Sequence, residues 1–168
     1  SISVSVDNKN QIACTDCHNA KLHVDDRINA HTDSVACQTC HVPEIAVKQA
    51  TKTHWDWSAA GNDAIEEDTH TYLKIKGSFI YQKNLQPEYR WYNGLADRYL
   101  LGDKVSPTGM TEMNAPKGDI RDADARIWPF KIHRAKQPYD IDLQHLLQPV
   151  TSGEGGYWKE FDWDASFR

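Results

Sequence analysis

One five-residue motif occurs twice within the first 41 residues of this chain. Its cysteine and histidine positions are Cys14, Cys17 and His18 in the first copy, and Cys37, Cys40 and His41 in the second. Cys-x-x-Cys-His is the attachment signature of a c-type haem, because two thiols bind one porphyrin and the next histidine becomes the proximal iron ligand. The two copies predict two covalent haems c, with His18 and His41 bound to iron.

Two other readings of these cysteines must be weighed. Together they form a C-x2-C-x19-C-x2-C pattern, which lies within the range of structural zinc sites. A zinc site does not need a histidine after each pair, whereas haem attachment does, and the chain has eight histidines in all. The other reading is a disulfide pair or a redox Cys-x-x-Cys motif, and the βαβ pattern that a thioredoxin-like site needs is not evident. Haem attachment is therefore favoured.

Length and composition predict one domain, or one domain with a small appendage, and a modest core. The chain has 168 residues, of which 39% are hydrophobic. Two porphyrins would add apolar surface, so we expect haems to form much of the core. We predict a mainly irregular fold with short α-helices and a few short β-hairpins. Residues 1–48 form the expected dihaem-binding segment, and residues 49–168 an aromatic-rich, haem-free segment that packs on the haems.

Charge and hydropathy exclude two classes of partner. The formal net charge is −5, whereas nucleic-acid binding favours a basic face. No run of 18 apolar residues is present, so we expect no membrane span. Because c-haem is attached after export, we expect a bacterial periplasmic or extracellular protein whose leader is removed or lies outside this sequence. The alternation at residues 2–6 predicts a strand.

Local patterns predict several short elements. Residues 34–41 favour a helix that carries the second motif, with Asp33 or Ser34 as its N-cap and Pro43 at its end. Residues 71–81 favour a strand pair around Gly77, and the dipeptide at 93–94 favours a hairpin turn.

The remainder of the chain is less regular. Residues 102–127 are predicted to be loop, and residues 128–133 extended. A short helix is expected around 143–147, and an amphipathic element from residue 157 onward with no stop signal.

Electron-transfer haems usually have a second axial ligand, which is a histidine or a methionine. Met110 and Met113 lie in the predicted loop. Our order of preference among the histidines is His31, then His23, then His133. The other candidates rank lower and are His54, His70 and His145. A bis-histidine iron has no open position, so it transfers electrons and does not bind substrate.

Two further features of the sequence bear on the site. Lys131 and Lys136 flank His133, and a lysine-bound or open iron would favour catalysis, although solvated charge or propionate binding is the commoner role. All six tryptophans lie beyond residue 48, where packing against haem is favoured over a substrate pocket. A calcium ion is a weaker idea, because no EF-hand spacing joins its candidate ligands, which are Asp56, Asp103, Asp119, Asp122 and Asp124.

Several blocks resemble the octahaem cytochromes of the tetrathionate-reductase family. They extend over nearly the whole chain from residue 14, at positions 37–43, 53–61, 76–79, 87–94, 101–104, 128–134, 137–140 and 161–163. The resemblance implies a periplasmic, haem-rich, mostly helical and irregular protein. It also implies reduction of tetrathionate, nitrite or hydroxylamine at one special haem.

The chain departs from that family in haem number, with two motifs where the family has eight. It resembles the C-terminal portion, whereas the special haem lies nearer the family's N-terminus. We therefore expect a dihaem electron-transfer unit whose partners are redox proteins or other haem-bearing segments of the same assembly. The alternative is part of a periplasmic multihaem reductase. Some histidines of this chain would then bind haems of another segment.

Overall fold

The structure is a computed structural model that describes residues 13–19 and 21–167, so the strand expected at 2–6 lies outside it. The chain forms two compact units. The first unit contains Ser1–Ile45, Leu85–Leu100 and Glu112–Lys131. The second contains Ala46–Asn84, Leu101–Thr111 and Ile132–Arg168. Short helices and short strands are separated by long irregular stretches, which confirms the predicted fold class.

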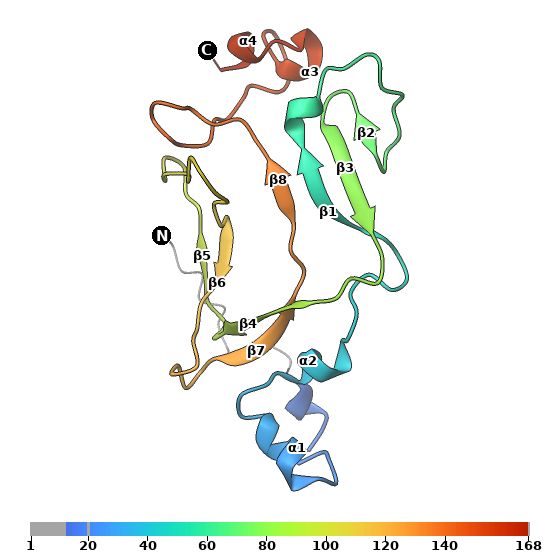
Figure 1. The fold of residues 1–168 in the computed structure, drawn as a ribbon, viewed down its shortest axis with the longest axis vertical. Helices are drawn as coiled ribbons and strands as arrows, with labels where there is room; N and C mark the ends of the chain where they lie inside the picture. The colour runs from blue at the N-terminus through green and yellow to red at the C-terminus, as the bar shows by residue number, and fades with distance from the viewer. Residues whose placement is uncertain (1–12, 20, 168) are drawn as a thin grey trace. The chain divides into compact units, whose positions relative to one another are not determined.

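Two small antiparallel sheets form the framework of the first unit (Figure 1). Strand β4 (Glu88–Tyr92) pairs with β7 (Arg126–Phe130), and β5 (Ala96–Arg98) pairs with β6 (Asn114–Pro116). Tyr92 makes edge-to-face contacts with two rings of β7. Such aromatic pairs across neighbouring strands stabilise the sheet and hold β7 in place.

Three short helices carry the motifs and the segment between them. They are η2 (Cys14–Asp16), α1 (Asp26–His31) and α2 (Cys37–His41). The helix expected at 34–41 therefore begins later, and its N-cap is Ala36 instead of Asp33 or Ser34.

The late start of α2 has a clear cause. The backbone of residues 34–36 is committed to β7, because Ile127 donates to the Ser34 carbonyl at 2.8 Å and accepts from the Ala36 amide at 3.0 Å. Groups bonded to another strand cannot also form the first turn of a helix. The second motif is thereby attached to the β4–β7 sheet.

The hairpin predicted at Asn93 and Gly94 is wrong. The strands on either side, β4 and β5, pair with β7 and β6 and not with each other. The Asn93 side chain instead accepts from the Leu95 amide at 3.0 Å and donates to the Asp122 carboxylate at 2.7 Å. Its backbone amide donates to the Lys117 carbonyl at 2.8 Å. These bonds hold the chain as it passes between the two sheets.

The second unit contains a four-stranded sheet in the order β2-β3-β1-β8. Its strands are β1 (Thr51–Asp56), β2 (Tyr72–Leu73), β3 (Gly77–Gln82) and β8 (Arg134–Lys136). The β2–β3 pair confirms the strand pair expected at 71–81. Strand β8 lies parallel to β1. Between β1 and β2 lies the short helix η3 (Trp57–Ala59), whose N-cap is Asp56, because the Asp56 carboxylate accepts from the Ser58 amide.

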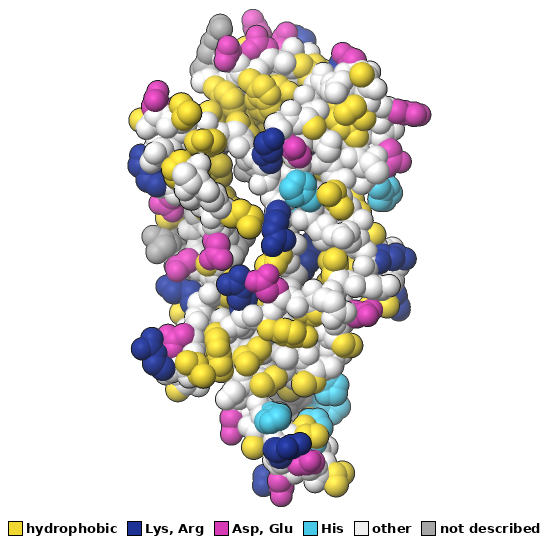
Figure 2. Space-filling view, in the orientation of Figure 1, with side chains coloured by type: hydrophobic (Ala, Val, Ile, Leu, Met, Phe, Trp, Pro, Cys, Tyr) yellow, Lys and Arg dark blue, Asp and Glu magenta, His cyan; other side chains and the backbone are white. Residues whose placement is uncertain are grey.

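Aromatic packing forms the core of the second unit. The buried side chains include Tyr72, Phe79 and Tyr157. The C-terminal element is two helices, α3 (Tyr157–Glu160) and α4 (Trp163–Ser166), near which hydrophobic side chains gather in Figure 2. They are separate because Phe161 is left-handed (φ 53°) and Asp162 caps α4.

Three further expectations concern the irregular stretches. The loop expected at 102–127 contains β6 and the start of β7, and β7 covers the first half of the extended piece expected at 128–133. The helix expected around 143–147 is absent, because Asp140 accepts from the amides of Asp142 and Leu143 and closes a turn. None of the helices in the described ranges combines the length and apolarity needed to cross a membrane.

Candidate haem sites

Both cysteine motifs form a single helical turn. In the first, the Cys17 and His18 amides donate to the Cys14 carbonyl at 3.3 and 3.0 Å. In the second, the same positions form α2. Residues three and four apart lie on one face of a helical turn. Each turn therefore presents its two thiols and its histidine on a common face, which is the arrangement that one porphyrin requires.

The two turns are anchored differently through the residue before the second cysteine. In the first motif, Asp16 accepts the Ala13 amide at 2.8 Å and so closes its own turn. In the second, the Thr39 hydroxyl donates to the Ile127 carbonyl of β7 at 2.6 Å. The first anchor is local, whereas the second fastens the motif to the sheet of the first unit.

The surroundings of the cysteines fit a porphyrin better than a zinc ion. Cys37 is half-buried, and the other three cysteines are exposed. In the described ranges, no group of three or more histidine, cysteine or acidic side chains is gathered for a metal ion. Four apolar side chains near the motifs are exposed, and these are Leu22, Val24, Ile28 and Val42. A covering apolar group would remove this surface from water.

One pair of histidine rings stands out in this segment. The ring centres of His23 and His41 lie 6.3 Å apart, and the ring planes differ by 25°. His23 precedes α1, whereas His41 ends α2, so the fold of the segment brings the two rings together. Histidine side chains gather over α1 and α2 in Figure 2.

His23 is more enclosed than the other histidines of this segment. It is half-buried, whereas His18, His31 and His41 are exposed. Its Nδ1 atom is buried and has no hydrogen-bond partner among the residues that the structure describes. A buried polar atom without a hydrogen-bond partner costs free energy, which the packing around this ring must offset.

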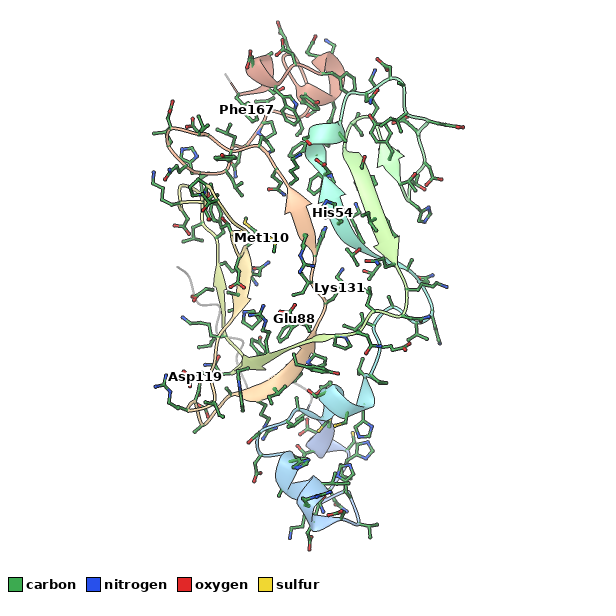
Figure 3. The ribbon with its side chains drawn as sticks, viewed as in Figure 1. His54, Glu88, Met110, Asp119, Lys131 and Phe167 are labelled. Atoms are coloured by element: carbon green, nitrogen blue, oxygen red, sulfur yellow. The ribbon has the colours of Figure 1, made fainter. Side chains whose placement is uncertain are left out.

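The other ligand candidates lie elsewhere. His31 is exposed in the last turn of α1, and His133 belongs to the second unit between β7 and β8. His54 lies on β1 of that unit (Figure 3). Met110 and Met113 are exposed by 73% and 42%.

The five aspartates considered for calcium are divided between the two units. Asp56 and Asp103 belong to the second unit, and the other three to the first. Hydrogen bonds from Ser58, with the nearby positive charge of Lys136, hold the pKa of Asp56 below its ordinary value. Asp119, labelled in Figure 3, likewise has a lowered pKa because its carboxylate accepts from Arg121.

Sequence reasoning missed the short helix α1 and the residue on it that touches His23. The side chain of Asn29 bonds both backbone groups of His23. Asp25 caps this helix by accepting the Arg27 amide at 2.8 Å. An aspartate before a short polar stretch was the available signal, because Asp is a preferred N-cap.

Comparison with known proteins places the chain in a family. The family described as bacterial cytochrome c matches residues 52–168, so the chain belongs to it. The matched range is the aromatic-rich stretch beyond the two motifs. The fold and the two motif turns thus define a multihaem c-type cytochrome, in which covalently bound haem transfers electrons.

Comparison with solved structures identifies a specific protein that this chain resembles. The chain is similar to the octahaem cytochrome c from Shewanella oneidensis, at 46% identity and a TM-score of 0.85. The alignment covers 93% of this chain and 37% of that chain, so this chain spans little more than a third of that protein's length. No curated protein matches.

Proposed function

We propose that this chain carries two covalent haems c, at Cys14/Cys17 and at Cys37/Cys40, and relays electrons between them within a longer multihaem cytochrome. Each bound haem supplies a one-electron iron couple. His18 and His41 are the proximal ligands. His23 would be the second ligand of the iron that His41 holds, and the 6.3 Å between the centres of these two rings is the observation that carries this assignment.

The spacing of the two rings matches one iron between them. Two imidazoles on opposite faces of one iron have ring centres about 6 Å apart, because each metal–nitrogen bond is about 2 Å and each nitrogen lies about 1 Å from its ring centre. The centres of His23 and His41 are 6.3 Å apart. Because the Nδ1 atom of His23 is buried, the other ring nitrogen would be the one that binds iron.

Offset stacking of two surface histidines is the alternative explanation, because aromatic ring pairs in contact have centres 4.5–7 Å apart. Stacking alone involves no bond between either imidazole and iron. Coordination on both sides of iron holds them and produces a low-spin haem. Removal of His23 therefore separates the two explanations.

Six-coordination of the iron at His41 favours electron relay over chemistry at that iron, since substrate would have no position to occupy. Reduction of tetrathionate, nitrite or hydroxylamine would belong to the longer protein. His31 and His133 remain predicted ligands for the haem at His18 or for haems of other segments. We place the protein in the bacterial periplasm, where c-type haem is attached, with redox proteins or other haem-bearing segments as partners.

The number of haems is tested by intact mass under denaturing conditions together with a pyridine haemochrome assay. Two haems per chain are expected, and the added mass should survive unfolding because thioethers are covalent. Cys14→Ser/Cys17→Ser and Cys37→Ser/Cys40→Ser should each lose one haem. A colourless protein with stoichiometric zinc, or four thiols that all react with an alkylating agent, would exclude the proposal.

A further inference from the structure

The main chain at His23 is held by one side chain. The His23 amide donates to Asn29 Oδ1 at 2.9 Å, and Asn29 Nδ2 donates to the His23 carbonyl at 2.7 Å. Both bonds are half-buried. Within the described part of the chain, these are the hydrogen bonds found for the backbone of His23. Residues 21–25 have no regular structure that could replace them.

Asn29 is itself fixed by the helix that carries it. Its amide donates to the carbonyl of Asp25, the N-cap of α1, at 3.1 Å. Its carbonyl accepts from the amide and hydroxyl of Thr32 at 3.2 and 2.7 Å. The helix is exposed over most of its length and buries none of its residues. A short exposed helix contributes little to a core, so its contact with His23 is its clearest structural role.

The carboxamide is the chemical group that this arrangement needs. It offers a donor and an acceptor on one planar group, and so bonds an amide and a carbonyl at once. Aspartate has the same shape but offers no donor when ionised, and its negative charge would face the His23 carbonyl. Alanine removes both bonds.

We propose that Asn29 is the positioning residue that holds His23 over the iron at His41. The inference rests on the proposed function, because it presumes that His23 is the distal ligand. The helix α1 then serves as a brace that fixes one ligand, while the bond from Thr39 to β7 fixes the segment that carries the other. Loss of the brace frees His23 to leave the iron, although the haem stays attached through its thioethers.

The test uses the holoprotein and counts the haems that bind carbon monoxide after reduction, alongside the high-spin fraction of the oxidised protein. His23→Ala is the reference and should add one CO-binding haem per chain. Asn29→Ala and Asn29→Asp should raise the high-spin fraction and CO affinity of that haem by about tenfold, the effect of losing one or two hydrogen bonds. Arg27→Ala is the matched control, since its exposed side chain lies on the same helix.

The possible outcomes are distinct. Wild-type spectra in both Asn29 variants, with a high-spin haem in His23→Ala, would overturn the positioning role and leave the proposed function standing. A fully low-spin His23→Ala protein would overturn the distal assignment and the inference together. If the Asn29 variants do not take up haem, hydrogen exchange of the wild-type holoprotein tests whether Asn29 holds the His23 backbone. The His23 amide should exchange at least tenfold more slowly than that of exposed Val24, and equal rates would exclude the brace.

Discussion

The imidazole of His23, which precedes α1, lies with its centre 6.3 Å from that of His41 at the end of α2, and the two planes are 25° from parallel. The rings come from either side of a short helix, and each belongs to a segment fixed by its own hydrogen bonds, one to Asn29 and the other to β7. The separation of the ring centres is close to that of two imidazoles bound to one metal ion. It predicts which histidine substitutions change the spin state of the haem at His41.

His23→Ala should convert the haem at His41 from low-spin to high-spin, because one axial ligand is lost. The measurement is cleanest in a Cys14→Ser/Cys17→Ser background, where that haem is the one remaining on the chain. Electron paramagnetic resonance should then show a high-spin ferric signal. His31→Ala in the same background is the control and should stay low-spin. A low-spin His23→Ala protein together with a high-spin His31→Ala protein would reverse the assignment.

Thr39→Val should destabilise the holoprotein by about 1 kcal/mol, the usual net contribution of one hydrogen bond. The hydroxyl that donates to Ile127 is lost, while the side-chain volume is nearly kept. The Ile127 carbonyl still accepts from the Ala36 amide, so the cost should stay at the low end for a half-buried bond. Urea unfolding of the holoprotein measures it. Thr39→Ser retains the donor and should lie close to wild type, so an equal loss in both variants would argue against this bond.

Gly77→Ala should destabilise the second unit by about 3 kcal/mol or more, through overpacking and backbone strain. A Cβ atom here would lie 2.1 Å from the Asp56 carbonyl oxygen of β1, and the residue has φ +84°. Gly94→Ala is a matched control with φ +90° and no heavy atom within 4 Å, so it should cost about 1 kcal/mol from strain alone. Thermal unfolding compares the two variants, and equal losses would contradict the role of the close approach.

Acid should destabilise the second unit partly through Asp56. Hydrogen bonds from Ser58, followed by the charges of Lys136 and His54, lower the pKa of this carboxyl below its usual 3.8. Its stabilising effect is therefore fully present above the unfolded-state pKa and is lost as the pH falls through the lower folded-state pKa. Asp56→Asn should be less stable than wild type at neutral pH, and the difference should shrink below about pH 4. Urea midpoints from pH 2 to 7 measure it, with exposed Glu66→Gln as control.

The class of the protein could be predicted from sequence, because the haem-attachment motif is confined to five consecutive residues. The strand pair at 71–81 was also predictable, since alternation and Gly77 are local signals. The hairpin at Asn93 was predicted wrongly, because the dipeptide indicates a turn but not which strands pair across it. The helix at 34–41 was misplaced for a similar reason, as Ile127 uses the backbone of residues 34–36.

The choice among the candidates for the distal ligand also depends on contacts that local sequence signals do not reveal. Distance along the chain ranked His31 above His23, since the candidates have identical side chains and their sequence positions say little about where their rings lie. Folding of the segment around α1, with Asn29 bonded to the backbone of His23, brings the His23 ring beside His41 and leaves His31 exposed. Sequence alone determined the cofactor, because thioether attachment is a local property. Tertiary structure decided which ring faces His41, because that position depends on hydrogen bonds between residues that no local pattern connects.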